Sequence, residues 1–481
     1  MLYKIITSPV VIGLTKIHNP VKKAISTCFI LFSSLLVVAQ QPLTLKQAIE
    51  TAVVNYPAIK AKTNYALASK AAIGQTKADY LPNLNLSAQQ DYGTVNGQNG
   101  PLYGFGGFGV ASSGIPLPNQ NWNAAFGSLY LANLNWEFFT FGRIKERIKT
   151  AQQVAVRDQN DLQQELFNHK VKVAAAYLNL LAAQKLTDSY RKNLARADTF
   201  KRIVKTRAFN GLIAGVDSSQ ASAEVSSARI VLTRAIDQEQ EQSNQLSQLM
   251  GVTPTHFDLD TVFVSHLPKN IEEPIDSAVS KHPTLAYYKS RIDVNNEQIK
   301  YLKKFNYPSF SFVGIVQTRG SGFSNEYSTN QNAYTDNYWD GTKPTRSNYL
   351  VGIGVSWNLA QPFRTAKQVK TQRYVSAALT DEYELANQQI KAQFSLADTK
   401  TINALNNYRE APVQVRAASQ AYLQKSVLYK NGLTNLVDVT QAQYALTRAE
   451  TDRDIAYTNV WQALLLKAAA KGDFNLFDSA L

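Results

Sequence analysis

The residues that most often carry out catalysis or bind metals are few in this sequence. Its five histidines are His18, His169, His256, His266 and His282. None has a partner at the spacing that a metal-binding pair requires. The glycine-rich run Gly104-Phe105-Gly106-Gly107-Phe108-Gly109 is not followed by a predicted helix, so it does not fit a phosphate-binding loop. We therefore expect no enzymatic activity, no cofactor and no bound metal.

Two aspartates that follow glycine-containing turns offer a different kind of chemistry. Asp438 lies three residues after Asn435, which is the spacing of a capping box, and Asp217 has the equivalent place in an earlier segment. The helix dipole stabilises an acid in the first helical turn, so capping alone would explain such a residue. Several copies of the same carboxylate around a narrow passage would attract cations. Taken alone, these residues favour capping.

Both aspartates lie in a sequence that contains one pattern twice. Pro57 and Pro82 recur 226 residues later as Pro283 and Pro308. The segment from Trp136 to Asp217 recurs 221 residues later, so only the part between the two strands of each copy differs in length. Such self-similarity predicts two copies of one structural unit. The expected parts are a first repeat at 40–253, a connector at 254–273, a second repeat at 274–471 and a C-terminal tail at 472–481.

Two segments in each repeat alternate apolar with small or polar residues, which predicts strands. The expected strands cover about residues 83–91, 127–139, 309–318 and 348–359. The second should place Tyr130, Ala132, Leu134, Trp136 and Phe138 on one face, and the fourth Tyr349, Val351, Ile353, Val355, Trp357 and Leu359. This alternation fits a half-exposed soluble sheet and also a transmembrane barrel with a polar lumen. Aromatic residues near the strand ends favour the barrel.

The number of strands has a consequence for assembly. Four strands are too few to close a barrel, since the smallest single-chain barrels have about eight. If these strands lie in a membrane, several copies of the chain must share one barrel. The loop expected at 93–122 is longer than a hairpin requires, and loops of this length are usually functional or mobile.

Very long helical segments follow the second strand of each repeat. Residues 143–208 and 364–429 are rich in strong helix formers and contain one proline, Pro412. Each would span about 100 Å and end near a glycine that caps it in a left-handed conformation. The resulting coiled-coil hairpins should have their tips near 208–217 and 429–438. The sequence further predicts a short strand or irregular structure at 262–264 and a poorly ordered tail after residue 472.

The N-terminal segment has the pattern of a secretory signal peptide. Residues 1–39 contain four lysines and no acid and end in an apolar run, so we expect cleavage before Gln40. The only cysteine, Cys28, lies in that run, so the mature chain would form no disulfide. The formal charge of +14 would fall to +10 with those four lysines. Because the remaining basic residues are spread among acids, we expect no nucleic-acid partner.

This order of elements, found twice, resembles the TolC family of outer-membrane efflux and secretion channels. The motifs are Leu43-Thr44-Leu45-Lys46-Gln47-Ala48-Ile49, Tyr80-Leu81-Pro82, Trp136 to Arg143, and Asn431-Gly432-Leu433-Thr434-Asn435-Leu436-Val437-Asp438. The resemblance implies a mainly α-helical fold with a membrane β-barrel, in which long coiled-coil hairpins join four strands per chain. It implies a homotrimer that completes a twelve-stranded barrel in the cell outer membrane and extends a helical tunnel into the periplasm.

The resemblance also implies roles for residues at the hairpin tips. Asp438 matches one of the acidic positions that line the closed end of the tunnel, and a second acidic position is Gln441 here. The link that helps to hold the tunnel closed matches Asp217 and Tyr429. An arginine that supports this link in the family is Thr434 here, so the latch is expected to be weaker or built differently.

The glycine–leucine tips are the expected contacts with partner proteins. They are Gly211, Leu212, Gly432 and Leu433, and the resemblance implies that they meet a periplasmic adaptor (membrane fusion) protein. The prediction is a trimeric outer-membrane channel of a tripartite efflux or type I secretion system, a passive duct opened at its periplasmic tip by the adaptor and an inner-membrane pump. The alternative is a secreted, non-channel coiled-coil scaffold or adaptor with a soluble β-sheet.

Overall fold

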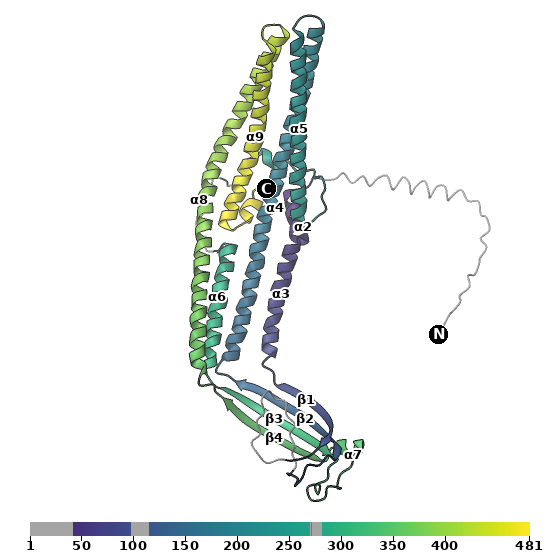
Figure 1. The fold of residues 1–481 in the computed structure, drawn as a ribbon. Helices are drawn as coiled ribbons and strands as arrows, with labels where there is room; N and C mark the ends of the chain where they lie inside the picture. Colours follow the sequence, from purple (N-terminus) through teal and green to yellow (C-terminus); the bar gives the residue numbers. More distant parts are fainter. Residues whose placement is uncertain (1–41, 98–114, 270, 272–280) are drawn as a thin grey trace, which may run out of the picture.

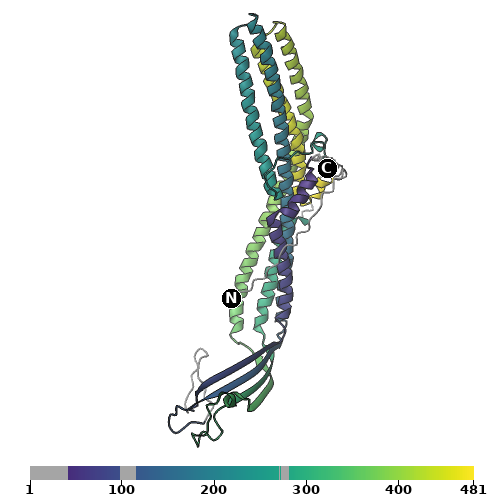
Figure 2. The same ribbon diagram turned by 90° about the vertical axis from the view of Figure 1, so that its right-hand side faces the viewer.

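The computed structural model describes residues 42–97, 115–269, 271 and 281–481. The expected signal peptide at 1–39 and the glycine-rich run at 104–109 lie outside the described residues. Long helices form a rod with a four-stranded sheet at one end (Figure 1). At the other end, two helical hairpins reach their tips beside each other (Figure 2). No helix in the described ranges is both long and apolar enough to cross a membrane.

The first half of the chain runs from the middle of the rod to the sheet and then along the whole rod. Its elements are α2 (Leu45–Asn55), α3 (Pro57–Ala78), β1 (Asn83–Thr94), β2 (Ala124–Phe139), α4 (Arg143–Phe209) and α5 (Gly215–Met250). Thr44 and Gln47 form a capping box at the start of α2. Pro57 occupies the first turn of α3, where its missing N–H costs nothing, and this separates α3 from α2.

The second half repeats this order of elements after a connector that contains the short helix η1 (Phe263–Ser265). Its elements are α6 (Pro283–Lys303), η3 (Lys304–Asn306), β3 (Ser309–Ser321), α7 (Tyr338–Thr342), β4 (Arg346–Ser356), α8 (Gln361–Lys430), α9 (Leu436–Lys471) and α10 (Asn475–Asp478). Helices α5 and α9 both have 36 residues. They end at Gly251 and Gly472, whose φ angles of +66° and +74° favour glycine.

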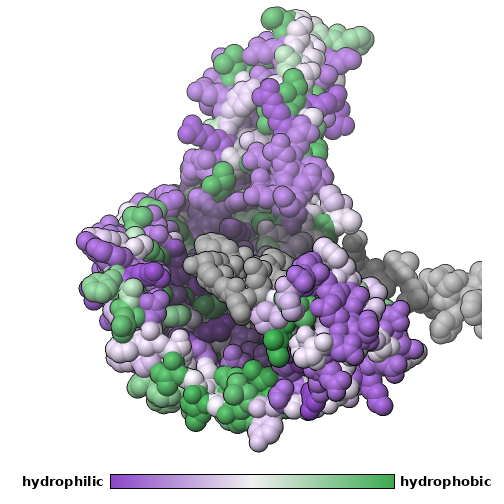
Figure 3. Space-filling model, turned by 60° about the horizontal axis from the view of Figure 1, so that its bottom comes forward, coloured by the Kyte–Doolittle hydropathy of each residue, from purple (hydrophilic) through white to green (hydrophobic). Residues whose placement is uncertain are grey.

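The strands form one antiparallel sheet in the order β1-β2-β3-β4, so β1 and β4 are its edges. Leu86 pairs with Ala132, Ala132 with Val316, and Val316 with Tyr349. Residues in register point to the same side, which defines an apolar face. This apolar face comprises Leu84, Leu86, Tyr130, Ala132, Leu134, Trp136, Phe310, Phe312, Val316, Tyr349, Val351, Ile353 and Val355. Seen from the sheet end, the molecule is hollowed, and hydrophobic residues gather along the lower rim of the view (Figure 3).

A β-bulge corrects one expected position on the apolar face. The sequence predicts Phe138 there, but the register of β2 against β3 shifts between Glu137 and Phe139. Phe139 therefore pairs with Phe310, and the two ring centroids are 5.9 Å apart. A bulge adds one residue to one strand and turns the following side chains to the other side, which strict alternation does not anticipate.

The fourth strand is shifted relative to the expected range. It begins at Arg346 and ends at Ser356, so Trp357 and Leu359 lie beyond it rather than on the apolar face. The indole N–H of Trp357 donates to the backbone carbonyl oxygen of Asn306 at 3.1 Å. This bond fixes the indole beside the junction between the sheet and the helices.

The main hydrophobic core lies halfway along the rod, and one expectation is wrong there. The sequence predicts a poorly ordered tail after residue 472, but the tail forms α10 and buries Phe477, whose ring lies 6.1 Å from that of Trp461. Of the two alternatives for residues 262–264, the strand is not found: the connector contains the single 3₁₀ turn η1 between otherwise irregular described residues. Phe263 of η1 meets Trp461 edge to face at 4.9 Å. Both segments gain their order by burying aromatic surface.

Candidate gate at the hairpin tips

Each hairpin turns at a glycine in the left-handed region. Gly211 has φ +69° and Gly432 has φ +76°, values at which other side chains are strained. The N–H of the residue after each glycine donates to the carbonyl five positions earlier, at 2.9 Å in both hairpins. These bonds close α4 and α8 in a Schellman motif. The predicted turn glycines thereby place Leu212 and Leu433 at the end of the rod.

Asp438 lies in the first turn of α9 and is engaged within its own hairpin. Its backbone N–H donates to the side-chain oxygen of Asn435 at 2.9 Å, so Asn435 caps the helix. Its carboxylate accepts from the Thr434 hydroxyl at 2.5 Å and from the Lys425 ammonium at 2.9 Å. The Thr434 bond, followed by the Lys425 bond, lowers the pKa of Asp438 below its ordinary value. Asp438 is therefore ionised at neutral pH, with its charge offset by Lys425.

Asp217 has the equivalent place in α5 but lacks such partners. Ala214 precedes the helix and provides no side-chain cap. Among the residues that the structure describes, none makes a hydrogen bond or an ion pair with the half-buried Asp217 carboxylate. The same holds for the exposed side chain of Gln441. Of the two predicted lining positions, Asp438 is paired with Lys425 and Gln441 is uncharged, whereas the predicted latch residue Asp217 carries a charge without a cationic partner in the described part of the chain.

Tyr429 joins the two hairpins through packing. Its side chain is buried in a small cluster to which α4, α5 and α9 all contribute, and its ring centroid lies 5.1 Å from that of Phe200 on α4. Its hydroxyl has no hydrogen-bond partner within the described ranges. Burial, and then the negative charge of Asp217, raises the pKa of Tyr429. The structure therefore brings the two predicted latch residues near each other without a hydrogen bond between them.

Arg207, near the end of α4, makes a contact between the hairpins that sequence reasoning missed. Its guanidinium donates to the backbone carbonyl oxygens of Tyr429 and Lys430, the latter at 3.2 Å, and lies 5.2 Å from the centroid of the Tyr429 ring. These carbonyls end α8, where the helix dipole favours a cation. The repeat counterpart of Arg207 is Leu428. Arg202 likewise corresponds to a leucine, Leu423, so the repeat does not single out Arg207.

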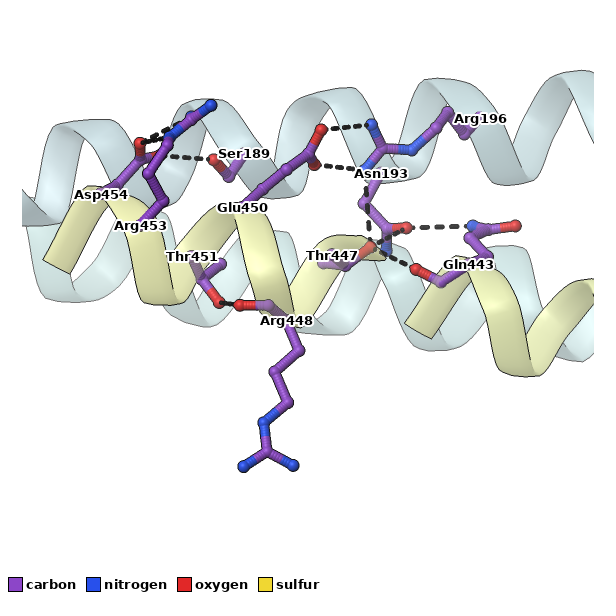
Figure 4. Close-up of polar contacts among 10 residues, drawn as sticks. All are labelled: Ser189, Asn193, Arg196, Gln443, Thr447, Arg448, Glu450, Thr451, Arg453 and Asp454. Atoms are coloured by element: carbon purple, nitrogen blue, oxygen red, sulfur yellow. Dashed lines mark hydrogen bonds and ion pairs between the residues drawn. The ribbon is translucent and has the colours of Figure 1, made fainter. Parts of the chain in front are cut away.

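A polar seam joins α4 to α9 between the tips and the main core (Figure 4). The side-chain oxygen of Asn193 accepts from Gln443 at 3.0 Å and from Thr447 at 2.8 Å, and all three residues are buried. Arg196 forms a bidentate ion pair with Glu450, in which Nη2 lies 2.7 Å from Oε2 and Nη1 lies 3.1 Å from Oε1. Separating Asn193 from Gln443 and Thr447 would leave buried polar groups unpaired, which is costly, so these bonds favour one alignment of the two hairpins.

The extreme tips expose apolar side chains. Leu433 is 72% and Leu212 is 66% exposed. Sequence reasoning missed Phe209, the last residue of α4, which is 91% exposed and whose repeat counterpart is Lys430. The two tips therefore differ, and the first presents the larger apolar surface.

Comparison with known proteins identifies this architecture. Residues 48–252 match the family model described as outer membrane efflux protein. The CusC channel structure has a TM-score of 0.72 at 14% identity, with 91% of this chain and 93% of that chain covered. The CmeC outer-membrane channel of Campylobacter jejuni has a TM-score of 0.70 at 14% identity, with 89% of this chain and 85% of that chain covered. The open state of the MtrE outer-membrane channel of Neisseria gonorrhoeae has a TM-score of 0.66 at 16% identity, with 89% of each chain covered. No curated protein matches the chain.

The fold is that of the TolC family. The resemblance predicted from the sequence is confirmed at the level of the fold, which the chain shares with these outer-membrane channels. Within this TolC-like fold, the first hairpin is α4–α5 and the second is α8–α9. Thr434, which was predicted to match the family's latch arginine, bonds Asp438 inside the second hairpin, whereas Arg207 extends from the first hairpin to the second.

Proposed function

We propose that three copies of the chain form an outer-membrane channel, the passive exit duct of a tripartite efflux or type I secretion system. The observation that carries the proposal is a four-stranded sheet with an exposed apolar face and two unpaired edges. On β4 the apolar face is open, and Ile353 is 68% exposed. An apolar surface of this extent on a sheet fits contact with lipid chains.

The unpaired edges support assembly into a closed barrel. In lipid, each unsatisfied backbone N–H or C=O group costs several kcal/mol. Pairing β4 of one copy with β1 of the next would satisfy both edges. Three copies would supply twelve strands, which exceeds the minimum of about eight. The polar face opposite the apolar face would then line a wet lumen.

The contacts at the tips support a gate at the periplasmic end. Arg207, the buried Tyr429 and the polar seam hold the second hairpin against the first. Opening would require α8 and α9 to move relative to α4 and α5, which an adaptor and an inner-membrane pump would drive. An open state of the similarly folded MtrE channel supports the view that such a fold has more than one state.

The exposed tips support an adaptor as the partner. The end of the rod exposes three apolar side chains that no described residue covers, those of Leu212, Leu433 and Phe209. Exposed apolar residues grouped in this way favour a protein contact. The adaptor would bind both tips and meet more apolar surface on the first.

The stoichiometry of the purified protein tests this function. The full-length protein should leave outer membranes only with detergent and should have the mass of a trimer by light scattering after correction for bound detergent. A detergent-free monomer would overturn the channel and would favour the secreted scaffold with a soluble sheet.

The orientation of the sheet can be tested with one pair of variants. Ile353→Arg, on the apolar face, should cost roughly 2–4 kcal/mol near the bilayer midplane and reduce trimer yield. Ser356→Arg, on the opposite face of the same strand, should assemble and change the conductance. Equal trimer yields for the two variants would contradict the assigned faces.

A further inference from the structure

The loop between β3 and β4 folds back over the apolar-face side of the sheet, at the end away from the helices. It carries α7, which packs on β2 and β3 (Figure 1). The buried Ser128 hydroxyl donates to the carbonyl oxygen of Thr342 at 2.9 Å, and the Tyr338 ring meets Phe126 edge-on at 5.2 Å. Ser128 and Phe126 lie an even number of residues from the apolar-face positions of β2, so they point to the same side. Helix α7 therefore covers one end of the apolar face.

Close backbone contacts hold α7 rigidly in this position. A Cβ atom on Gly341 would lie 2.5 Å from the carbonyl oxygen of Phe126, and one on Gly320 would lie 2.5 Å from that of Lys343. Neither contact leaves space for a side chain. The Tyr338 hydroxyl also donates to Gln90 on β1 at 2.7 Å, so the loop is tied to three strands.

This rigid platform presents a large aromatic side chain to the outside. Trp339 is 77% exposed, although the residues on both sides of it are held by hydrogen bonds at the start of the helix. Tryptophan side chains are highly buried on average, so an indole this exposed is unusual. An indole with an apolar ring and a polar N–H suits the boundary between lipid chains and headgroups.

The height of α7 fits such a boundary. The apolar face of β2 extends from Tyr130 to Phe139, at the sheet–helix junction. At about 3.3 Å per residue and a tilt of about 40°, this stretch rises roughly 23 Å, close to the apolar band of about 25 Å in membrane barrels. Just beyond Tyr130 the apolar-face side becomes polar, at Gln90 and Ser128, and α7 begins there.

We propose that α7 lies in the interface of the outer leaflet and that Trp339 inserts between its lipid headgroups. The proposal rests on the proposed function, since it requires the apolar face to be the lipid face. The occupant is the membrane because α7 lies on the same side of the sheet as the apolar face and just beyond its end, at the height of the expected boundary. Trp339 then anchors the outer edge of the barrel and limits its vertical movement.

Depth-dependent fluorescence quenching tests the position of Trp339. Full-length protein is reconstituted in phosphatidylcholine vesicles that contain lipids brominated either near the headgroup or near the chain end. The signal of Trp339 is the difference between wild type and Trp339→Phe. We expect this difference signal to lose intensity with shallow bromines and to change little with deep bromines. Quenching by aqueous acrylamide alone would overturn the proposal, and so would resistance to all quenchers, which would indicate burial against a second copy.

Trp136 separates failure of the anchor from failure of the channel. It lies on the apolar face, so its own difference signal, from Trp136→Phe, reports membrane contact of the sheet. Lipid quenching of Trp136 without quenching of Trp339 would overturn only the anchor. Absence of lipid quenching for both would overturn the proposed function itself.

A glycine pair tests whether the platform positions the indole. Gly341→Ala should displace α7 from Phe126, so the Trp339 signal should lose its lipid quenching and gain acrylamide quenching. Gly352→Ala is the matched control, since a Cβ there meets nothing within 4 Å. Unchanged quenching of Trp339 in Gly341→Ala would contradict a role for the platform.

Discussion

Replacing Arg207 by leucine should favour the open channel. Leucine is the natural choice because Leu428 has the equivalent position in the second repeat and is accommodated at the same place on its helix. The substitution removes both hydrogen bonds to the end of α8 and the contact with the Tyr429 ring. It leaves the turn at Gly211 intact, because that turn uses the backbone carbonyl of residue 207 and not its side chain.

The expected magnitude follows from these contacts. A hydrogen bond that involves a charged group contributes about 1.5–3 kcal/mol, and a cation–π contact at an accessible site about 0.5–1 kcal/mol. Because Arg207 is half-exposed, the low end of these ranges applies, and we expect about 2 kcal/mol per chain. At 1.36 kcal/mol per factor of ten, this corresponds to about a 30-fold shift toward the open state.

Single-channel recording in planar bilayers measures the shift as open probability. Arg202→Leu is the matched control, since Arg202 lies on the same helix and, among the residues that the structure describes, its guanidinium bonds only to Thr199 of that helix. Arg207→Lys should give an intermediate effect, because the ammonium keeps the charge but cannot form the same fork. Unchanged open probability in Arg207→Leu, or an equal increase in Arg202→Leu, would refute the role assigned to Arg207.

Three further predictions follow from the site and the core. Asp217→Asn should lower cation selectivity more than Asp438→Asn, because Lys425 already offsets Asp438; reversal potentials in salt gradients measure this, and equal effects would contradict it. Phe209→Lys should weaken adaptor binding roughly 10- to 100-fold, from the loss of about 1.5–3 kcal/mol of apolar burial, and surface plasmon resonance should detect it. Burial lowers the pKa of both His169 and His282 in the folded protein. In the unfolded chain a histidine has a pKa of about 6.5. As the pH falls below that value, the unfolded chain therefore binds protons that the folded protein does not, and this favours unfolding. Thermal stability should therefore be retained above about pH 6.5 and fall below it. Circular dichroism melts at about pH 7.5 and about pH 5.5 measure this fall in melting temperature, which should be smaller in the double variant His169→Gln, His282→Gln than in the wild type.

The parts of the fold that sequence predicts well depend on local sterics. Pro57 and Pro283 begin helices because proline fixes the first helical turn. Gly211 and Gly432 end helices because only glycine adopts their φ angles without strain. Such residues act on their immediate neighbours, and their duplication, at an offset of 226 residues for the prolines and 221 for the glycines, made the pattern visible without any knowledge of the packing.

The parts that sequence misses depend on contacts between distant segments. Phe477 follows a glycine near the end of the chain and has no periodic neighbours, so only the pocket beside Trp461 explains its burial. The bulge at Phe139 is likewise visible only against the partner strand. Arg207 is one of several cations near the end of α4, and its partners lie 222 and 223 residues away. No local pattern distinguishes it from its neighbours.

The two repeats share a backbone but have diverged at their tips. The partners of Asp438, which are Lys425, Thr434 and Asn435, correspond to Val204, Ile213 and Ala214 in the first repeat. Conversely, Arg207 and Phe209 correspond to Leu428 and Lys430. The second tip therefore holds its acid within its own turn and exposes Leu433, whereas the first tip exposes Leu212 and Phe209 and contacts the second through Arg207. Because Phe209 and Arg207 lie in the same last turn of α4, a partner that displaces this turn when it binds Phe209 would also pull Arg207 away from α8. In the proposed channel, adaptor docking and release of the latch are thus two effects on one helical turn.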